Sequence, residues 1–424
     1  MGRARFFRRG VGRVSLSTLR PPHFPGRAPY LWSNFLVGDV QTGIMPLLSV
    51  DLIGLRHWPS VEVGELLALG GFVALLFQPI AGILADSLPQ KRELFLFLAL
   101  CFAGGVILMA GSPTADGAIE AQILLGIAQG GFMPVLGAVA MGLTGREGFP
   151  RAMSWAQGMG HGGSVFGALS VALIGLHGSM SDVYLFYAGS SLAAAILLFG
   201  VPGKAIDPVR AREAEERHPS LAPRKILTFP FVFFLLMVLL FFTANTAMLP
   251  LAGLKLQGML PSLSDPSRIG LLVAATQLVM IPFSLWSSSF HAGFGGRGAF
   301  FLLPFAILSL RGVVLSGSGG VWGVLFGQVL DGGLMGILSV MLPVAVAEMV
   351  RGSGRFNFAS GLTGAVSALG GSASQVISGM FFDRIGVDRT LMVFAGIAFC
   401  GLILSLVFSW RARSDRGRRV SDKF

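Results

Sequence analysis

Residues 320–350 read GVWGVLFGQVLDGGLMGILSVMLPVAVAEMV. Apart from Asp331 and Glu348 this stretch carries no charged residue. At about 1.5 Å per residue a helix of this length exceeds the ~30 Å hydrocarbon core of a bilayer. Exposed irregular backbone is not viable in lipid, so the stretch predicts a membrane-spanning helix. Asp331 lies near its middle, where a carboxylate needs a specific reason to be present.

The composition of the whole chain agrees with a membrane protein. Hydrophobic residues make up 53% of the chain, charged residues only 12%, and the mean hydropathy is +0.73. Soluble domains carry about 25% charged residues. The net charge of +11 comes from basic residues in short pieces between apolar runs. This pattern favours a positive-inside membrane protein over a nucleic-acid-binding protein. Cys101 and Cys400 show no spacing typical of a metal site or a disulfide framework.

Apolar runs long enough to span a bilayer recur along the chain and predict an all-α protein with twelve transmembrane helices. The expected spans are 31–54, 62–85, 93–111, 118–143, 152–176, 183–202, 229–252, 268–289, 298–316, 320–348, 356–381 and 388–410. An even number of crossings places both termini on one side. Most Lys and Arg residues lie in the termini and in the loops of that side, which predicts that both termini are cytoplasmic.

The polar segments divide the chain into five parts. We expect a basic N-terminal tail, a six-helix bundle, a linker, a second six-helix bundle and a basic C-terminal tail, at residues 1–30, 31–203, 204–227, 228–410 and 411–424. The segment 1–30 is rich in Arg and free of acidic residues, so it is open to three interpretations: a genuine tail, a targeting segment or the product of an upstream start codon.

The two expected bundles share markers at a nearly constant offset. Residues 128–133 read AQGGFM, and residues 330–335 read LDGGLM, 202 positions later. Four further pairs lie 203 to 205 positions apart, at the same places in the predicted helices: Pro46 and Pro250, Pro79 and Pro282, Arg92 and Arg297, Arg151 and Arg355. Markers in the same order at the same spacing predict an internal duplication.

Two motifs carry a resemblance to a known family. The loop 82–92, GILADSLPQKR, resembles the signature G-x-L-a-D-r-x-G-r-k/r of major facilitator transporters, with Gly82, Asp86, Lys91 and Arg92 in matching places. The run LLGIAQGGFMPVLGAV resembles the family pattern R-x-x-Q-G-x-x-x-x-P, with Gly126 where the family has arginine. The chain is similar to uncharacterised bacterial members over about residues 30–410. The resemblance implies two pseudo-symmetric six-helix bundles in a bacterial inner membrane.

The signature loop suggests a gate. Asp86 ends a predicted helix on the cytoplasmic side, where its carboxylate can lie against the N-terminus of another helix. In the family that helix is the eleventh span, which here begins near Phe356. The resemblance therefore implies a gating loop made of Gly82, Asp86, Lys91 and Arg92. The alternative is that Lys91 and Arg92 act only as topology signals.

Four ionisable residues lie deep in the predicted spans: Asp39, His161, Arg311 and Asp331. Each needs a partner, a cavity or neutralisation, because a charge inside the bilayer is costly. Asp39 and His161 could form a proton-exchanging pair, since the unperturbed pKa of histidine is about 6.5. Asp331 could face the cavity as a protonatable or cation-binding group, or it could pair with Arg311 as a structural counter-ion. Both interpretations of Asp331 remain open.

The expected solute and coupling cavity combines these residues with neutral amides. Its members are Asp39, Gln41, Gln129, His161, Asn245, Gln328 and Asp331, and Gln277 and Gln375 are further amides that could add hydrogen bonds. The spacing of Cys, His and acidic residues indicates no catalytic set, metal site or cofactor.

The expected function is secondary transport of a small amphipathic or cationic solute by alternating access. Proton-coupled export is the preferred form, and facilitated or proton-coupled uptake is the alternative. A transport-dead sensor or scaffold is an alternative from another class. The expected partners are the solute, membrane lipid and protons, with no nucleic acid, and we expect a monomer.

Overall fold

The protein is described by a computed structural model at residues 21–111, 114–214, 222–257, 259–260, 265–288 and 299–421. Residues 1–20 of the basic tail and the second copy of the signature loop, residues 289–298, lie outside these ranges. The longer helices are α1 (Arg27–Thr42), α3 (Ser60–Ser87), α4 (Lys91–Ala110), α5 (Ala115–His177), α6 (Met180–Phe199), α8 (Phe229–Asn245), α10 (Asp265–Ser287), α11 (Leu302–Gly317), α12 (Val321–Met349) and α13 (Phe356–Ser421). The shorter ones are α2 (Ile44–Ser49), a π-helix (Val50–Leu55), α7 (Pro208–Ala211) and α9 (Met248–Gln257).

Among the described residues, seven helices are long and apolar enough to cross a membrane. Two of them, α5 and α13, each contain two expected spans. Both are interrupted at a glycine, Gly145 (φ 61°) in α5 and Gly386 (φ 79°) in α13. A positive φ costs glycine little because it has no Cβ, so the chain can turn at these points. The expected spans 118–143 and 152–176 lie on either side of Gly145.

The first expected span, 31–54, is broken rather than continuous. α1 ends at Thr42, and the chain continues through α2 and the π-helix. Within the π-helix the carboxylate of Asp51 is buried; it accepts a hydrogen bond from the hydroxyl of Tyr184 (2.6 Å) and pairs with Nε of Arg56 (2.9 Å). These bonds join the π-helix to α6 and provide a partner for a buried charge.

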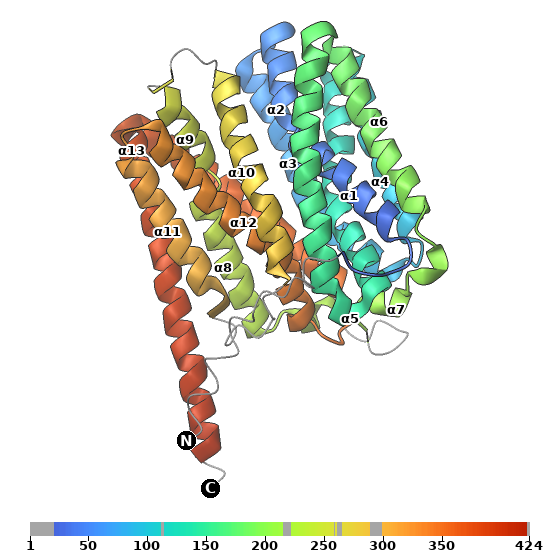
Figure 1. The fold of residues 1–424 in the computed structure, drawn as a ribbon, viewed down its shortest axis with the longest axis vertical. Coiled ribbons are helices and arrows are strands. Elements are labelled where there is room, and N and C mark those ends of the chain that lie inside the picture. Colours follow the sequence, from blue (N-terminus) through green and yellow to red (C-terminus); the bar gives the residue numbers. More distant parts are fainter. Residues whose placement is uncertain are drawn as a thin grey trace.

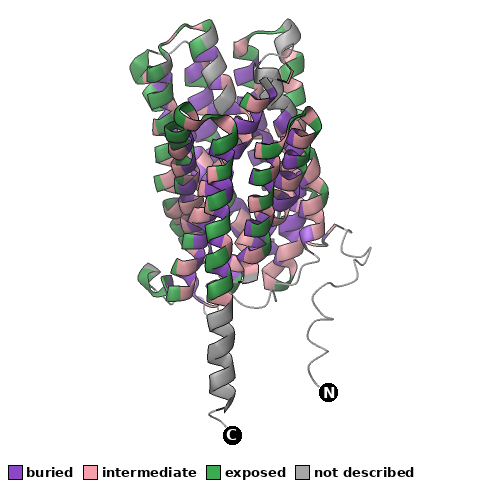
Figure 2. Ribbon diagram, turned by 90° about the vertical axis from the view of Figure 1, so that its left-hand side faces the viewer, coloured by how far each residue is buried: buried purple, intermediate pink, exposed green. Residues whose placement is uncertain are grey.

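The helices form two groups that lie side by side (Figure 1). α1, α3, α4, α5 and α6 pack against one another, and so do α8, α10, α11, α12 and α13. The two groups meet mainly where α3 packs on α13 and where α5 packs on α10 and α12. Figure 2 shows buried residues inside the groups and exposed ones around the outside. Large apolar side chains such as Leu173 and Ile196 lie on this outer surface, as expected for a surface that contacts lipid.

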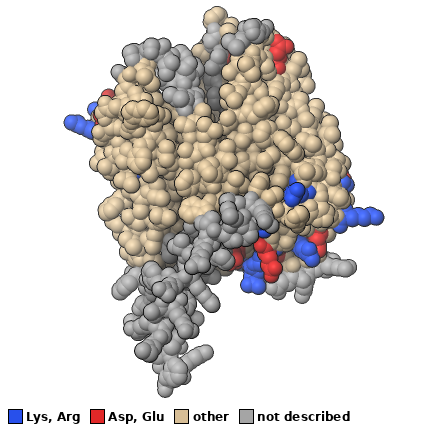
Figure 3. All heavy atoms as spheres, in the orientation of Figure 1, with Lys and Arg blue, Asp and Glu red and all other residues tan. Residues whose placement is uncertain are grey.

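One end of the molecule carries much of the charge. Figure 3 shows most of the visible Lys and Arg side chains on the lower half, with a largely uncharged surface above. The contacting segments 86–92, 199–214 and 349–357 lie at this end, which we call the basic end. Here α3 and α13 approach so closely that a Cβ at Gly82 would overlap the backbone of Asn357. Small residues of this kind allow membrane helices to pack backbone to backbone.

Candidate functional site: a polar cavity between the two helix groups

A cavity of about 180 Å³ lies between α1, α5 and α10. Its lining combines amide, imidazole and hydroxyl groups with apolar side chains and backbone: Asn34, Val37, Gly38 and Gln41 from α1, Met133, Ala156, Gln157, Gly160, His161 and Ser164 from α5, and Gln277 and Met280 from α10. The cavity therefore has walls from both helix groups. Of the expected site residues, Gln41 and His161 line it, together with Gln277, one of the two further amides.

A row of polar side chains on α5 joins the two helix groups beside this cavity. The hydroxyl of Ser154 lies 3.1 Å from that of Ser287, the amide of Gln157 donates to the carbonyl oxygen of Ser339 (3.3 Å), and Nδ1 of His161 lies 2.8 Å from Oε1 of Gln277. Positions 154, 157 and 161 follow the i, i+3, i+7 spacing of one helix face. We call Ser154, Gln157 and His161 the α5 polar face.

Asp39 lies next to the cavity lining in sequence, but its carboxylate points elsewhere. It accepts a hydrogen bond from the hydroxyl of Tyr187 (3.4 Å) and lies against Gly167, where a Cβ would overlap it. No hydrogen bond or ion pair links Asp39 to His161, although the structure describes both residues. The expected carboxylate–imidazole pair is therefore not formed here, because α1 directs Asp39 into its own helix group.

The remaining expected site residues of the second group form a separate buried cluster. Nη1 of Arg311 lies 3.0 Å from Oδ1 of Asp331 and donates to Oδ1 of Asn245 (2.6 Å). Nη2 of Arg311 donates to Oε1 of Gln328 (3.4 Å), which also accepts from the hydroxyl of Thr276 (3.1 Å). The structure thus contains the ion pair that the structural interpretation of Asp331 requires.

This cluster lies apart from the cavity. Asn245, Gln328 and Asp331 are buried within the second helix group and are not among the residues that line the cavity. Gln129 is half-buried on α5 and is likewise absent from the lining. For Asn245, Gln328 and Asp331 the reason is geometric, because their side chains point to neighbouring helices of the same group.

At the basic end, Asp86 forms the contact expected of the signature loop. Its Oδ1 accepts hydrogen bonds from the backbone N–H (3.0 Å) and side-chain amide (2.9 Å) of Asn357, and its Oδ2 accepts from the N–H of Phe358 (2.9 Å). These N–H groups belong to the first turn of α13, so a carboxylate caps the N-terminus of a helix in the other group. Lys91 donates to the carbonyl oxygens of Ala85 and Leu88 and holds the loop.

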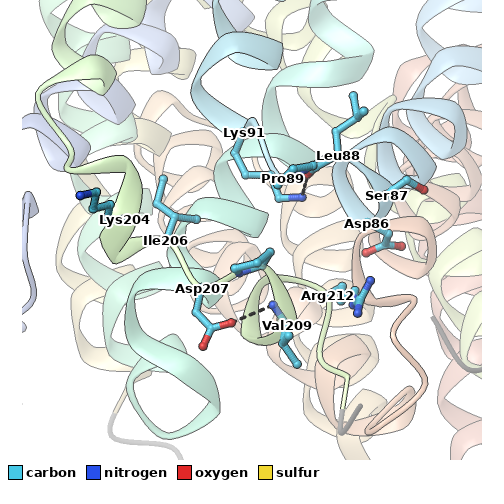
Figure 4. Close-up of a pocket in the computed structure, with 11 residues that line it drawn as sticks. Asp86, Ser87, Leu88, Pro89, Lys91, Lys204, Ile206, Asp207, Val209 and Arg212 are labelled. Atoms are coloured by element: carbon cyan, nitrogen blue, oxygen red, sulfur yellow. Dashed lines mark hydrogen bonds between the residues drawn. The ribbon is translucent and has the colours of Figure 1, made fainter. Parts of the chain in front are cut away.

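A second cavity of about 570 Å³ lies beside this contact. Figure 4 shows loop residues Asp86 to Lys91 on one side and linker residues Lys204 to Arg212 on the other. The side-chain amide of Asn357 donates to the carbonyl oxygen of Ala211 (2.8 Å) as well as to Asp86. Asn357 therefore links the signature loop, the linker and α13.

Comparison with known proteins agrees with this architecture. The sequence profile of the Major Facilitator Superfamily matches residues 30–355. The chain belongs to this superfamily. It is similar to an uncharacterized MFS-type transporter of Mycobacterium tuberculosis, from strains CDC 1551 and H37Rv. The two sequences are 28% identical over 386 residues, which cover 88% of this chain and 90% of the relative.

Two more distant matches point the same way. A triacylglyceride transporter of Mycobacteroides abscessus is 27% identical over 182 residues, 42% of this chain and 34% of that protein. The crystal structure of the human organic anion transporter MFSD10 matches 90% of this chain and 97% of its own, with a TM-score of 0.64 at 14% identity, which shows a common fold. The protein is an integral membrane transporter of the major facilitator fold and not an enzyme.

Several lining residues were not predicted from the sequence, although it contains a signal for them. On α1, positions 34, 37, 38 and 41 follow the i, i+3, i+4, i+7 spacing of one helix face, and on α5 positions 157, 160, 161 and 164 do the same. Asp39 falls outside this spacing. Gln375 is exposed on α13 and lies outside the cavity. Among the described residues no cluster of His, Cys, Asp and Glu has the arrangement of a metal site.

Proposed function

We propose that the protein is a secondary active transporter that exports a small amphipathic solute in exchange for protons. The observation that carries this proposal is a polar cavity with walls from α1 and α5 on one side and α10 on the other. Alternating access requires a site between two groups that can move against each other. We propose six-helix bundles at residues 31–203 and 228–410, joined by the linker 204–227.

The basic end supplies the gate in this proposal. The hydrogen bonds of Asp86 to the start of α13 join the two groups at one end only, so they favour a state closed at that end. By the positive-inside rule this end is cytoplasmic. We further propose that the protein acts as a monomer in a bacterial inner membrane, with both termini in the cytoplasm.

Asp39 is the proposed proton carrier. The residue is 3% exposed, its carboxylate receives one hydrogen bond from Tyr187, and its Oδ2 has no partner among the described groups. A buried carboxylate in a membrane needs either a counter-charge or neutralisation, and binding a proton neutralises it. Asp331 already has Arg311 as a counter-ion, which favours Asp39 over Asp331 for this role.

Proton release from energised vesicles tests this proposal. Everted membrane vesicles acidified by respiration receive amphipathic compounds that are neutral, cationic or anionic, and a pH-sensitive dye records the internal pH. A transported compound should release protons from vesicles with the wild-type protein, and Asp39→Asn should abolish the release. Asp116→Asn, at an exposed position in the first turn of α5, is the matched control. Solute movement that ignores the pH gradient would instead support facilitated transport.

A further inference from the structure

The cavity between α1, α5 and α10 has an uncharged lining. Its polar side chains are amides, an imidazole and a hydroxyl, and none of the described residues that line it is Asp, Glu, Lys or Arg. The nearest carboxylate along the chain, Asp39, points into its own helix group. An ion of either sign would enter this cavity without a counter-charge and would lose its hydration. The lining therefore favours an uncharged solute.

The hydrogen bond between His161 and Gln277 fixes the donor and acceptor roles of these two lining residues. An amide oxygen can only accept, so Nδ1 of His161 carries the hydrogen and donates to Oε1 of Gln277. In a neutral imidazole Nε2 is then an acceptor. This Nε2 is buried and has no partner among the described groups. The pair thus presents a donor and an acceptor side by side, with another acceptor on the same ring.

A solute that enters between α5 and α10 must replace this bond without leaving a polar group unpaired. Stranding a buried donor or acceptor costs its full desolvation penalty. A primary carboxamide satisfies both groups of this bond, because its oxygen can accept from Nδ1 of His161 and one N–H can donate to Oε1 of Gln277, while the amide side chains of the lining offer acceptors for its second N–H. Lactams and other cyclic amides also have an N–H donor beside a carbonyl acceptor.

Apolar groups in the same cavity can hold the rest of such a molecule. Met133 from α5, Met280 from α10 and Val37 from α1 all line it. Methionine side chains are flexible and polarizable, so they adapt to apolar bodies of different shape. We propose that the transported solute is a small uncharged molecule with a carboxamide or lactam-type edge on an apolar body, bound between His161 and Gln277. This inference rests on the proposed transport function.

Four benzene derivatives that differ only in their polar substituent test the proposal. Thermal unfolding of the purified full-length protein is measured with benzamide, N,N-dimethylbenzamide, benzoate and benzylamine. Benzamide should stabilise the protein most, because N,N-dimethylbenzamide lacks the donor and the other two are charged. Gln277→Leu should weaken the apparent affinity for benzamide by about tenfold. Gln375→Leu makes the same chemical change at an exposed position of α13 and should leave the affinity unchanged.

A second variant separates recognition from folding. Gln277→Glu keeps the shape of the side chain but adds a charge, so it should shift the preference from benzamide to benzylamine. Stronger stabilisation of the wild-type protein by benzoate or benzylamine, or no stabilisation by benzamide, would overturn the carboxamide assignment. Proton release from vesicles by a charged compound would then leave the transport proposal intact. Absence of release by every compound would count against the proposed exchange of the solute for protons.

Discussion

The sharpest test of the gate is the substitution Asp86→Asn at the basic end. Asp86 is 2% exposed, and its carboxylate accepts three hydrogen bonds from Asn357 and Phe358. An asparagine can still accept at one oxygen, but its NH₂ group would face a backbone N–H that needs an acceptor. The change removes at least one hydrogen bond to a charged group, about 1.5–3 kcal/mol, and the interaction with the α13 N-terminus, about 0.3–1 kcal/mol.

These losses amount to about 2–4 kcal/mol, and in the proposed gate they act only on the state in which the basic end is closed. At 1.4 kcal/mol for each factor of ten, the equilibrium should shift by about a hundredfold towards opening at this end. Such a shift is large enough to change which state dominates. Transport should slow, because a transporter that rarely closes on one side completes fewer cycles.

Cysteine labelling measures this shift. Ala359 is fully buried in the first turns of α13, and Ala359→Cys introduces a small thiol there. The native Cys101 and Cys400 are replaced by serine. A water-soluble maleimide should label the Ala359→Cys protein about a hundredfold faster when Asp86→Asn is also present. Asp116→Asn, at an exposed position on α5, is the control and should not change the rate.

An unchanged labelling rate would refute the gate. In that case the hydrogen bonds of Asp86 would exist in both states, and the residue would act only in topology or folding. Labelling that rises equally with Asp116→Asn would show a general loosening of the helix bundle instead. Only a rise specific to Asp86→Asn supports a bond that breaks in each cycle.

Two further predictions concern buried charges. Asp331→Asn should destabilise the protein by about 3–5 kcal/mol because it strands the fully buried Arg311, and the additional change Arg311→Gln should restore the thermal stability measured in detergent. If the single variant is as stable as the wild type, the ion pair is not structural. Tyr184→Phe should cost about 1.5–3 kcal/mol, since it removes a hydrogen bond to the buried Asp51, and an unchanged midpoint would contradict this.

The fold class could be predicted from the sequence, because apolar segments long enough to cross a bilayer have few possible structures other than helices in lipid. The predicted spans fall largely on helices, with breaks after Thr42 in the first span and after Asn245 in the seventh, and the contact of Asp86 with the start of α13 is present. The break in the first span was not predicted. Beyond this break the carboxylate of Asp51 meets Tyr184 and Arg56 only once α6 and the loop after the π-helix are in place.

The composition of the cavity was harder to predict, because it depends on how each helix is rotated about its axis. Asp39 was expected in the cavity because it lies deep in the first predicted span, yet its position is about 100° around α1 from its neighbour Gly38, which lines the cavity. The spacing of Asn34, Gly38 and Gln41 marked the correct face, but identifying it required knowing that α10 lies opposite. Packing, rather than local sequence, decides which polar residues meet the solute.

The predicted duplication suggests how one ancestral contact acquired two roles. With an offset of 204, the α5 polar face at 154, 157 and 161 corresponds to Phe358, Gly361 and Ala365 of α13. On α5 these positions carry hydrogen-bonding side chains that reach α10 and α12. On α13 they are apolar or small, and α3 packs so closely that a Cβ at Gly361 would overlap the carbonyl oxygen of Gln78.

The difference between these two interfaces matches the two roles that we propose, a gate at the basic end and a solute site between α5 and α10. Backbone-to-backbone packing of α3 on α13 leaves little room for a solute, but it brings Asp86 within reach of Asn357 and suits a latch. Side chains between α5 and α10 leave a cavity and provide replaceable hydrogen bonds, which suits a binding site. If this reasoning is correct, Gly361→Ala should weaken closure of the basic end without changing ligand affinity, whereas Gln277→Leu should do the reverse.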